Sequence, residues 1–476
     1  MIYSQAFRRF GEGKVVRAGL IGVGDFGAPI VTQSPLVRGL DLCVVADLDV
    51  ERGQRAYLEA GYGEEQIALC GSRAEALSEL EAGRRVVLDD ASLMMELPIQ
   101  VIATGTRVPE AGAVFAEQAI LHGKHVVMID KEADSVVGSL LKLLADRAGL
   151  VYTTDDGDEP GLLMGLYSWA QALGLEVLCG GKLESCLHDP RRNTLCARGR
   201  ESAVSPEDRW ALERIPGGQA RRYVEGRRHL RAAWQADEDR GDPICHMAII
   251  CNGTGLIPDA PTGHRSLVRL VEIPEVFCPE EEEGVLRTRG AVDMPTVLFG
   301  PDDPEPGGGV FLVVANADAG SREVMIEKGL VANSRRSAML LYRPYHLCGA
   351  ETAMSILCAG LLRVPTGATE VLPRVDILAT TARDYRAGEA LGSPGALGLD
   401  HGVKASLVPA FALTDTGPAP FFLLENRRLT QDTPAGTVIT MDRVDLPQDS
   451  PLLSLRKRQD ALFLRGGSSG RQVVGW

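Results

Sequence analysis

Residues 15–27, VVRAGLIGVGDFG, are the stretch that decides the fold. The apolar run at 15–21 predicts a buried strand, and Gly22, Gly24 and Gly27 follow it in the spacing G-x-G-x-x-G. In such a loop the first glycine permits a tight turn, the second lets a pyrophosphate approach the backbone, and the third lets the next helix pack closely on the strand. The stretch therefore predicts a dinucleotide-binding loop.

The residues around these glycines are predicted to complete the cofactor site. Asp25 and Phe26 lie inside the loop, and a helix is expected from about Asp25, so that its N-terminal amides face the phosphates. A second strand is predicted at 40–46, and Asp47 follows it directly, 20 residues beyond Gly27. An acidic side chain at that distance binds the ribose 2′-hydroxyl of a dinucleotide, and we predict this role for Asp47.

The choice between NAD and NADP depends on the charges that follow this strand. A 2′-phosphate would meet the carboxylates of Asp47 and Asp49, so the sequence favours NAD. Arg52 is near enough in the chain to keep NADP open as the alternative.

Strand and helix patterns alternate through residues 15–155. Further strands are predicted at 67–69, 99–103, 125–129 and 151–154, and helices at 50–61, 72–81, 109–122 and 135–149. This alternation predicts an α/β fold with a Rossmann-type, doubly wound parallel sheet. Ligands bind such sheets at the carboxyl ends of the strands, so Thr104 and Gly105 are predicted to contact the cofactor.

The composition bounds the class of protein. The chain has 476 residues, of which 45% are apolar and 24% charged, as in a globular protein of two or three domains. It has no apolar run of about 18 residues and no apolar signal-peptide core, so we expect a cytoplasmic protein without a membrane span. The net charge of −14 argues against nucleic-acid binding, which leaves a small-molecule substrate as the expected partner, in a homo-oligomer. The ten cysteines lack CxxC pairs and are expected as free thiols.

Three consecutive domains are predicted. The dinucleotide-binding domain spans 1–155 and starts with an arm at 1–13. An α+β substrate domain spans 156–372, with a helix at 161–174, strands at 176–182, 297–299 and 310–315, and an apolar helix at 348–362 that returns to the nucleotide fold. Short strands and turns predict a small β-rich domain at 373–476, whose glycine- and serine-rich tail, 466–476, is expected to be loose.

These motifs resemble a known family. The N-terminal half is similar to homoserine dehydrogenase in GVGDFG (22–27) and MIDKEA (128–133). Nearly the whole chain resembles homoserine-dehydrogenase-like oxidoreductases with a C-terminal SAF domain, whose signature RRLTQDTPAGTVITMDRVDLP matches. The internal motifs that match the group are GDEPG (157–161), GGKLES (180–185), CNGTGLIPD (251–259) and RPYHLCGAET (343–352).

The resemblance implies redox chemistry at a secondary alcohol or ketone. The group includes deoxyxylulose-phosphate reductoisomerase-like enzymes and resembles apionate oxidoisomerase, so rearrangement of the carbon skeleton is an implied second step. The chain lacks the DD-x4-D-x2-RK-type stretch of homoserine dehydrogenase itself, which makes homoserine a poor substrate.

Two lysines are candidate catalytic residues. Lys131 follows the strand at 125–129, at the carboxyl edge of the sheet, where an ammonium can hydrogen-bond a substrate oxygen and act as a general acid or base. It also matches the lysine of the homoserine-dehydrogenase pattern. Lys182 ends an apolar strand after Gly180 and Gly181, and can polarise a carbonyl. The alternative for each is an ordinary strand-end lysine.

Four carboxylates lie within residues 155–159, directly after the predicted strand at 151–154. They belong to Asp155, Asp156, Asp158 and Glu159. Glu159 is the candidate proton shuttle, because Pro160 and Gly161 place it at a helix start, and Asp158 is a candidate for substrate binding. Such carboxylates raise one another's pKa, or bind a divalent cation, or simply form a polar turn. No His/Cys spacing predicts a zinc site, and no metal is assigned.

The remaining substrate-binding candidates lie in loops of the middle region. Arg191 and Arg192 offer guanidinium groups that suit a carboxylate or phosphate, or form an exposed basic loop. Asn252 and Thr254 offer hydrogen bonds to substrate hydroxyls. His346 is a weaker candidate, because a lone histidine in such a setting is more often structural.

The sequence therefore predicts an NAD(P)-dependent oxidoreductase acting on a small polyhydroxylated acid or sugar phosphate. The rival hypothesis is an NAD-binding sensor without turnover, in which the C-terminal domain recognises a ligand or partner. The second lysine and the acidic cluster favour the enzyme, because a sensor needs neither.

Overall fold

The computed structural model describes residues 2–234, 241–392 and 399–464. They divide into two compact units. The first unit holds residues 2–161, 347–373 and 446–464, and the second holds the described parts of 162–346 and 374–445. These units group the chain differently from the three consecutive domains, whose boundaries stay predictions. No described helix combines the length and the hydropathy needed to span a membrane.

The first unit is built on a seven-stranded sheet in the order β3-β4-β2-β1-β5-β6-β7, in which every pairing is parallel. Its strands are β1 (Val16–Ile21), β2 (Leu40–Ala46), β3 (Ile67–Cys70), β4 (Arg85–Leu88), β5 (Val101–Thr104), β6 (His125–Met128) and β7 (Tyr152–Thr154). Side chains from both faces are buried, as expected where helices cover a parallel sheet on both sides. The predicted Rossmann-type sheet is confirmed.

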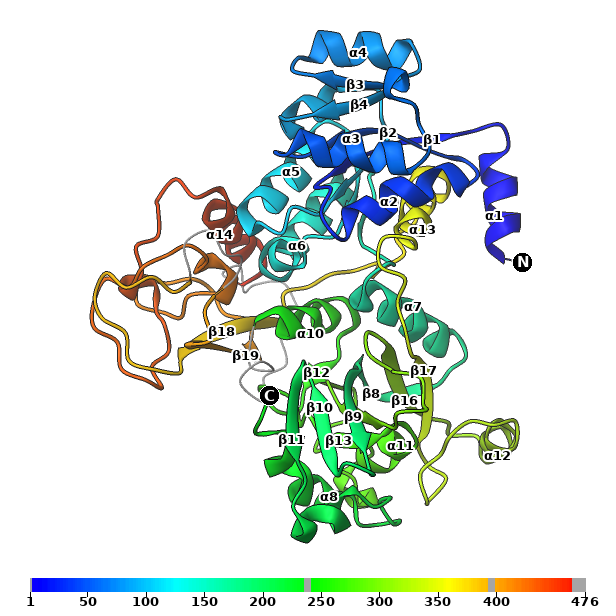
Figure 1. Ribbon diagram of the computed structural model, residues 1–476, viewed down its shortest axis with the longest axis vertical. Coiled ribbons are helices and arrows are strands. Elements are labelled where there is room, and N and C mark those ends of the chain that lie inside the picture. Colours follow the sequence, from blue (N-terminus) through cyan, green and yellow to red (C-terminus); the bar gives the residue numbers. More distant parts are fainter. Residues whose placement is uncertain (1, 235–240, 393–398, 465–476) are drawn as a thin grey trace. The chain divides into compact units, whose positions relative to one another are not determined.

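Helices cover this sheet and supply the other half of its core (Figure 1). They are α1 (Ile2–Gly11), α2 (Gly27–Gln33), α3 (Val50–Glu59), α4 (Arg73–Glu81), α5 (Pro109–Leu121) and α6 (Lys131–Arg147). Tyr57 on α3 and Ile30 on α2 are among the buried side chains that pack against β1 and β2. The six strands and five helices that the apolar periodicity predicts here are all present, and α1 and β4 are additional elements.

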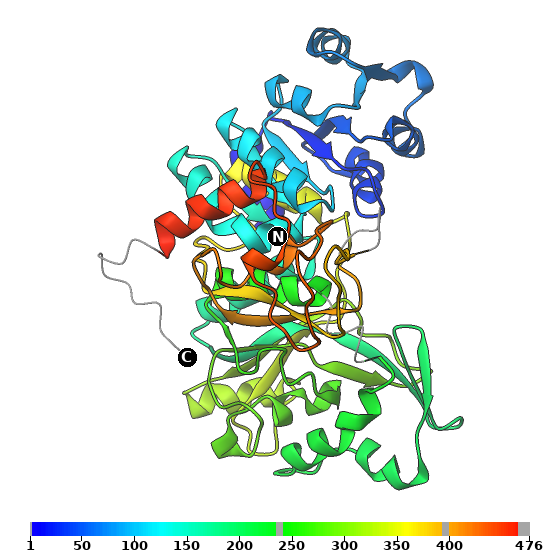
Figure 2. The same ribbon diagram turned by 90° about the vertical axis from the view of Figure 1, so that its left-hand side faces the viewer.

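Two later segments of the chain complete the first unit. Helix α13 (Thr352–Leu357) and a π-helical turn, η8 (Cys358–Leu362), bury Ile356, Leu357 and Ala359 in the same core. Helix α14 (Pro451–Phe463), drawn in red in Figure 2, packs against α5 and α6. Gln459 on α14 accepts a hydrogen bond from the Leu140 backbone and donates one to Val136.

The second unit contains two five-stranded mixed sheets. One has the order β12-β14-β8-β16-β17 and comprises β8 (Glu176–Lys182), β12 (Ile257–Pro258), β14 (Ala291–Asp293), β16 (Val310–Ala315) and β17 (Met339–Arg343). The other has the order β11-β10-β9-β15-β13 and comprises β9 (Glu184–Asp189), β10 (Thr194–Ala197), β11 (Arg200–Ala203), β13 (Leu267–Arg269) and β15 (Thr296–Phe299).

Helices and a short β-ribbon accompany these sheets within the second unit. The helices are α7 (Glu159–Ala172, mostly in this unit), α8 (Ala220–Arg227), α10 (Gly241–Thr254), α11 (Ile273–Val276) and α12 (Ala319–Glu327). Strands β18 (Val375–Thr381) and β19 (Val403–Pro409) form an antiparallel pair that contacts α10. Phe277 and Phe311 are fully buried in the core between β8, β16 and α11.

Four sequence predictions differ from this fold. The arm at 1–13 is mostly the helix α1, and the strand β4 was not predicted because its apolar run is only three residues long. Helix α6 begins at Lys131 and not at Ser135. The end of the predicted β-rich region is the helix α14, and the tail at 466–476 lies outside the described residues.

Candidate functional site

The glycine loop lies at the centre of the first unit's sheet, where β1 pairs with β2 on one side and β5 on the other. Gly22 has φ +92°, and a Cβ there would lie 2.2 Å from the Gly105 carbonyl oxygen. A Cβ on Gly27 would lie 2.1 Å from the Gly22 carbonyl oxygen. Both positions therefore require glycine, because the backbones of the loop, of α2 and of the β5 end approach so closely.

Gly24 differs from its two neighbours in the motif. A Cβ on Gly24 would have no protein atom within 4 Å among the described residues, so the fold itself does not require glycine there. The open space over this backbone is where a pyrophosphate would lie in a dinucleotide-binding loop. The loop thus fits the cofactor that its sequence predicts.

This contrast gives a prediction for two substitutions. Gly24→Val should leave the thermal midpoint within a few degrees of wild type but weaken NAD binding at least tenfold, because only the ligand needs the space. Gly27→Ala should instead destabilise the fold, by about 1–3 kcal/mol, because its methyl group overlaps a backbone oxygen. Calorimetric NAD titration and thermal unfolding of both variants check this, and equal affinity in Gly24→Val would contradict it.

Asp47 lies beside this loop, as its spacing predicts. Its carboxylate accepts hydrogen bonds from the backbone N–H groups of Val23, at 2.7 Å, and Asp49, at 2.9 Å. The carboxylate therefore ties the end of β2 to the glycine loop. Arg52 lies 3.2 Å from the Asp49 carboxylate, so its charge is already paired. Asp25 and Phe26 precede α2, which begins two residues later than predicted, at Gly27.

Thr104 and Gly105 lie at the end of β5, next to β1. The Thr104 hydroxyl is buried and points to the Met128 sulfur, at 3.2 Å, so it faces the neighbouring strand. Gly105 contacts the glycine loop directly through its carbonyl group. Asp130, which no sequence motif singles out, holds the turn that follows, because its Oδ1 accepts hydrogen bonds from the Thr106 hydroxyl and the Arg107 backbone. Burial raises the pKa of Asp130 to about 6.

Lys131 and Asp158 form an ion pair within the first unit, with Nζ and Oδ2 3.2 Å apart. Lys131 is the first residue of α6, at the sheet edge where β6 ends, and its side chain is 24% exposed. Asp158 is buried. An ammonium at a helix N-terminus opposes the helix dipole, so the nearby carboxylate compensates it while leaving part of the amine accessible. The structure thus brings together two residues that the sequence assigns to catalysis and substrate binding.

Asp155 extends this cluster into the core of the first unit. It is fully buried and its Oδ2 accepts a hydrogen bond from the Thr352 hydroxyl, at 2.9 Å. Burial raises the pKa of Asp155 to about 7, against the hydrogen bond from Thr352, and the charge of Asp158 adds to the rise. Burial raises the pKa of Cys348 to about 12, and the charge of Asp158 adds to the rise. Asp155 is therefore a carboxyl group of the acidic turn whose pKa lies well above the ordinary value.

Helix α13 positions this acidic turn. Ser355 accepts a hydrogen bond from the Asp156 backbone, at 2.9 Å, and lies 2.7 Å from the Thr366 hydroxyl. Thr366 in turn contacts Thr153 at the end of β7. Glu159 is buried at the start of α7, as predicted, and its backbone N–H donates to Asp158 Oδ1. A segment distant in sequence thus fixes the carboxylates.

Lys182 forms the second cluster, inside the second unit. Its ammonium lies 3.1 Å from His246 Nδ1 and 3.5 Å from Glu184 Oε1, and the side chain is buried. Arg198 pairs with the same Glu184, at 2.8 Å. The glycines before Lys182 have a structural reason, because a Cβ on Gly181 would lie 1.8 Å from the Asp293 carbonyl oxygen. The neighbouring strand, and not a ligand, approaches that backbone.

The other predicted substrate-binding residues are held by the second unit itself. Asn252 is buried, and its Oδ1 accepts from the backbones of Arg374, at 2.8 Å, and Val375, at 3.0 Å. Thr254 donates to the Ile250 carbonyl oxygen, at 2.6 Å, within its own helix. These contacts account for both side chains as anchors at the end of α10, and a role for them in substrate binding stays a prediction.

Two loops carry the remaining candidates. Arg191 and Arg192 lie in the turn between β9 and β10, and their backbones donate to Asp189. The Arg192 side chain is 64% exposed and pairs with Glu201, at 2.8 Å. His346 Nδ1 lies 2.5 Å from the Gly308 carbonyl oxygen, so it joins two loops of the second unit. The printed contacts of Arg192 and His346 lie within the second unit, and a role of the three residues in substrate binding stays a prediction.

Comparison with protein families agrees with the predicted class of protein, an oxidoreductase. Residues 238–352, about a quarter of the chain, match the family model described as oxidoreductase DRL, catalytic domain. The segment includes His246, Asn252 and Thr254. No curated protein matches the chain significantly. The more specific group that the sequence resembles, and its SAF domain, stay predictions.

Solved structures match part of the chain at low identity. An oxidoreductase from Agrobacterium radiobacter, solved with NAD+, L-tartaric acid and magnesium, is 13% identical over 36% of this chain and 44% of its own, with a TM-score of 0.26. A myo-inositol dehydrogenase from Lactobacillus casei, solved with NAD(H) and myo-inositol, is 14% identical over 37% and 46%, with a TM-score of 0.26. The chain spans less than half the length of each. It thus combines a Rossmann-type sheet with a segment that matches an oxidoreductase catalytic-domain model.

Proposed function

We propose that this protein is an NAD(P)-dependent oxidoreductase that acts on a hydroxyl or ketone of a small polyhydroxylated acid or sugar phosphate. The observation that carries the proposal is the loop between β1 and α2, where Gly24 leaves open space and Asp47 lies beside it. The match of 238–352 to an oxidoreductase catalytic domain supports the same class of reaction.

The first unit would hold the cofactor through residues that the fold already places together. Gly24 would accommodate the pyrophosphate, Gly22 and Gly27 would shape the loop around it, and Asp47 would bind the ribose hydroxyls. NAD is the preferred cofactor, because Asp47 and Asp49 follow β2 and Arg52 is paired with Asp49. When bound, the nicotinamide supplies the acceptor or donor of a hydride.

Lys131 is the proposed general acid and base. Its ammonium donates a hydrogen bond to the reacting substrate oxygen and polarises it, and in the oxidising direction the neutral amine accepts the hydroxyl proton. Asp158 keeps the ammonium in place at 3.2 Å, and Glu159 follows it at the start of α7. The buried carboxyl of Asp155 belongs to the same cluster, and burial raises its pKa to about 7, the range that suits a group exchanging protons with Lys131.

Lys182 is the proposed electrophile of the second unit. Contact with His246 on one side and Glu184 on the other lets a proton move between lysine, imidazole and carboxylate. Polarisation of a second substrate oxygen by such a lysine is what a rearrangement of an α-hydroxy ketone requires, and the resemblance to reductoisomerase-like enzymes motivates this finer hypothesis.

The first test is cofactor binding, measured by calorimetry with NAD and NADP on the wild type and on Asp47→Ala. We expect the wild type to prefer NAD and the variant to bind it about 10–100-fold more weakly, as the loss of a hydrogen bond to a charged group predicts. Thermal unfolding is the control, because Asp47 also binds the Val23 backbone. A wild type that binds neither cofactor would overturn the proposal.

The second test measures turnover, as the rise in absorbance when NAD is reduced to NADH. The NAD-loaded protein is mixed with a panel of four- and five-carbon sugar acids and sugar phosphates. Reduction of NAD with at least one of them is the expected result. Tight NAD binding without turnover on any of them would favour a sensor of the cofactor.

A further inference from the structure

The sheet β12-β14-β8 gathers polar residues at one edge of the second unit. β12, β14 and β8 are parallel neighbours, so their carboxyl ends meet at the same edge. Asp259 follows β12, Asp293 ends β14, and Lys182 ends β8. With neighbouring strands about 4.8 Å apart, the backbones at Asp259 and Lys182 are separated by about 10 Å. This edge therefore holds two carboxylates, those of Asp259 and Asp293, in addition to the ammonium of Lys182.

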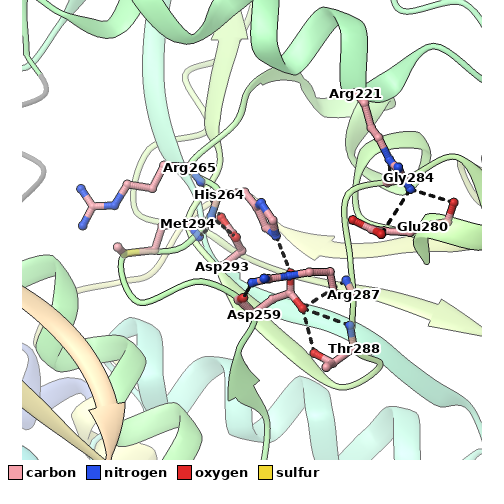
Figure 3. Close-up of polar contacts among 10 residues, drawn as sticks. All are labelled: Arg221, Asp259, His264, Arg265, Glu280, Gly284, Arg287, Thr288, Asp293 and Met294. Atoms are coloured by element: carbon pink, nitrogen blue, oxygen red, sulfur yellow. Dashed lines mark hydrogen bonds and ion pairs between the residues drawn. The ribbon is translucent and has the colours of Figure 1, made fainter. Parts of the chain in front are cut away.

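His264 lies in the loop after β12 and points its ring at Asp259 (Figure 3). His264 Nε2 is 2.7 Å from Asp259 Oδ2. The carboxylate is 1% exposed, whereas the imidazole is 20% exposed, so the ring stands between a buried acceptor and the solvent. A carboxylate at Nε2 fixes the tautomer of the neutral ring, with its proton on Nε2 and the lone pair on Nδ1.

The hydrogen bonds around Asp259 favour its ionised form. Its Oδ1 accepts hydrogen bonds from the Thr288 backbone, at 3.0 Å, from the Thr288 hydroxyl, at 2.9 Å, and from the Arg287 backbone, at 3.1 Å. The Arg287 side chain pairs with Oδ2, at 3.5 Å. Burial opposes ionisation, but the hydrogen bonds from His264 and Thr288 outweigh it and lower the pKa of Asp259.

A second aspartate holds the backbone of the same loop. Asp293 accepts hydrogen bonds from the backbone N–H groups of His264, at 2.6 Å, Arg265, at 2.9 Å, and Met294, at 2.8 Å (Figure 3). Gly263, with φ +74°, allows the turn that brings these groups to Asp293. One carboxylate thus orients the imidazole ring and another fixes its backbone, which is the preorganisation that a proton-transfer group needs.

We propose that His264 is a proton-transfer residue that contacts a hydroxyl of the substrate at this sheet edge. The proposal rests on the proposed oxidoreductase function and adds a base that neither the family match nor the sequence motifs assign. The ligand it fits is a small polyhydroxylated molecule, because a neutral imidazole oriented by a carboxylate accepts a proton from a hydroxyl group.

The step balances without any further reactant. The substrate O–H bond breaks, its proton forms a bond to Nδ1 of His264, and the electron pair stays on the substrate oxygen. The imidazolium that results keeps its Nε2–H hydrogen bond to Asp259, whose charge stabilises it. The proton returns to the substrate or to water at the end of the cycle.

Turnover of two variants is the first readout. His264→Gln should lower kcat by about 10²–10⁴-fold and leave NAD affinity unchanged, because the cofactor loop belongs to the first unit. Added imidazole should restore part of the activity of His264→Ala. The matched control is His229→Gln, which removes the imidazole of another His–Asp pair, His229–Asp208, and should leave kcat unchanged. Retention of kcat within threefold in His264→Gln would overturn the proposal.

A second readout needs no substrate and separates this proposal from the proposed function. Diethyl pyrocarbonate acylates accessible, unprotonated imidazole nitrogens, and mass spectrometry locates the label among the eight histidines. We expect rapid labelling of His264 in the folded wild type and slower labelling in Asp259→Asn, with His229 labelled equally in both. An unreactive His264 would overturn the proposal even if NAD binds, and a reactive His264 would show that failure of NAD binding lies in the proposed function and not in the accessibility of this imidazole.

Discussion

Lys131→Met is expected to lower turnover by about 10²–10⁴-fold while NAD affinity changes less than threefold. The methionine keeps an unbranched side chain, one atom shorter, but removes the ammonium that donates to the substrate oxygen. Lys131 is partly exposed at the carboxyl edge of the nucleotide sheet, next to β6, whereas its partner Asp158 is buried. Loss of the amine therefore removes a proton donor without removing a cofactor contact.

The measurement is the steady-state rate of NADH formation with the substrate found in the panel. Lys142→Met is the matched control, because Lys142 lies on the same helix and also pairs with a carboxylate, that of Asp146. This control should change stability at most. Wild-type kcat in Lys131→Met would exclude Lys131 as the acid or base.

Glu272→Gln is expected to reduce the free energy of unfolding of the second unit by about 3–5 kcal/mol. Arg227 and Glu272 form an ion pair at 2.7 Å, and their side chains are 0% and 2% exposed. Arg227 also donates to the carbonyl oxygens of Ala211, Leu267 and Glu213. The substitution removes the anion and leaves the guanidinium charge buried, and this uncompensated charge is the source of the loss.

The pH dependence of this loss has a definite sign. Burial opposes ionisation of Glu272, but the hydrogen bond and charge of Arg227 outweigh it, so the folded-state pKa lies below the ordinary value of 4.5. Stability from a lowered carboxyl pKa is fully present above the unfolded-state value and disappears as pH falls through the folded-state value. The difference between wild type and Glu272→Gln should therefore be full at pH 7 and shrink below about pH 4.

Chemical denaturation at pH 7 and at pH 3.5 measures both effects. The control is Glu225→Gln, which breaks the exposed pair Glu225–Arg228, whose side chains are 67% and 70% exposed. Such pairs contribute less than about 1 kcal/mol. Equal losses in the two variants would show that burial is not the cause.

The nucleotide loop and its acidic partner could be predicted from the sequence because both depend on local features. Glycine spacing after an apolar strand, and an acid after the next strand, are set by backbone sterics and by the length of one β–α–β unit. Gly22, Gly27 and Asp47 accordingly lie where the spacing places them. The position of Lys131 at the sheet edge follows from the same repeating pattern.

The contacts that complete the Lys131 and Lys182 clusters join residues far apart in the chain. No local sequence pattern predicts such contacts. Thr352 reaches Asp155 across 197 residues, and His246 reaches Lys182 across 64. The His264–Asp259 pair is closer in sequence, but an aspartate five residues before a histidine is common in loops. What makes the pair distinctive is the burial of Asp259 against Thr288, which only the tertiary structure shows.

The three-part make-up of the first unit has a consequence for how the chain is synthesised. Helix α14 packs on α5 and α6, although it leaves the ribosome roughly 300 residues after β7. At 5–20 residues per second this delay is about 15–60 s. During that interval the nascent nucleotide fold exposes the apolar surfaces that Ile356 and Leu453 later cover. We therefore expect this unit to depend more on chaperones in the cell than a unit of the same size whose residues are contiguous in the chain.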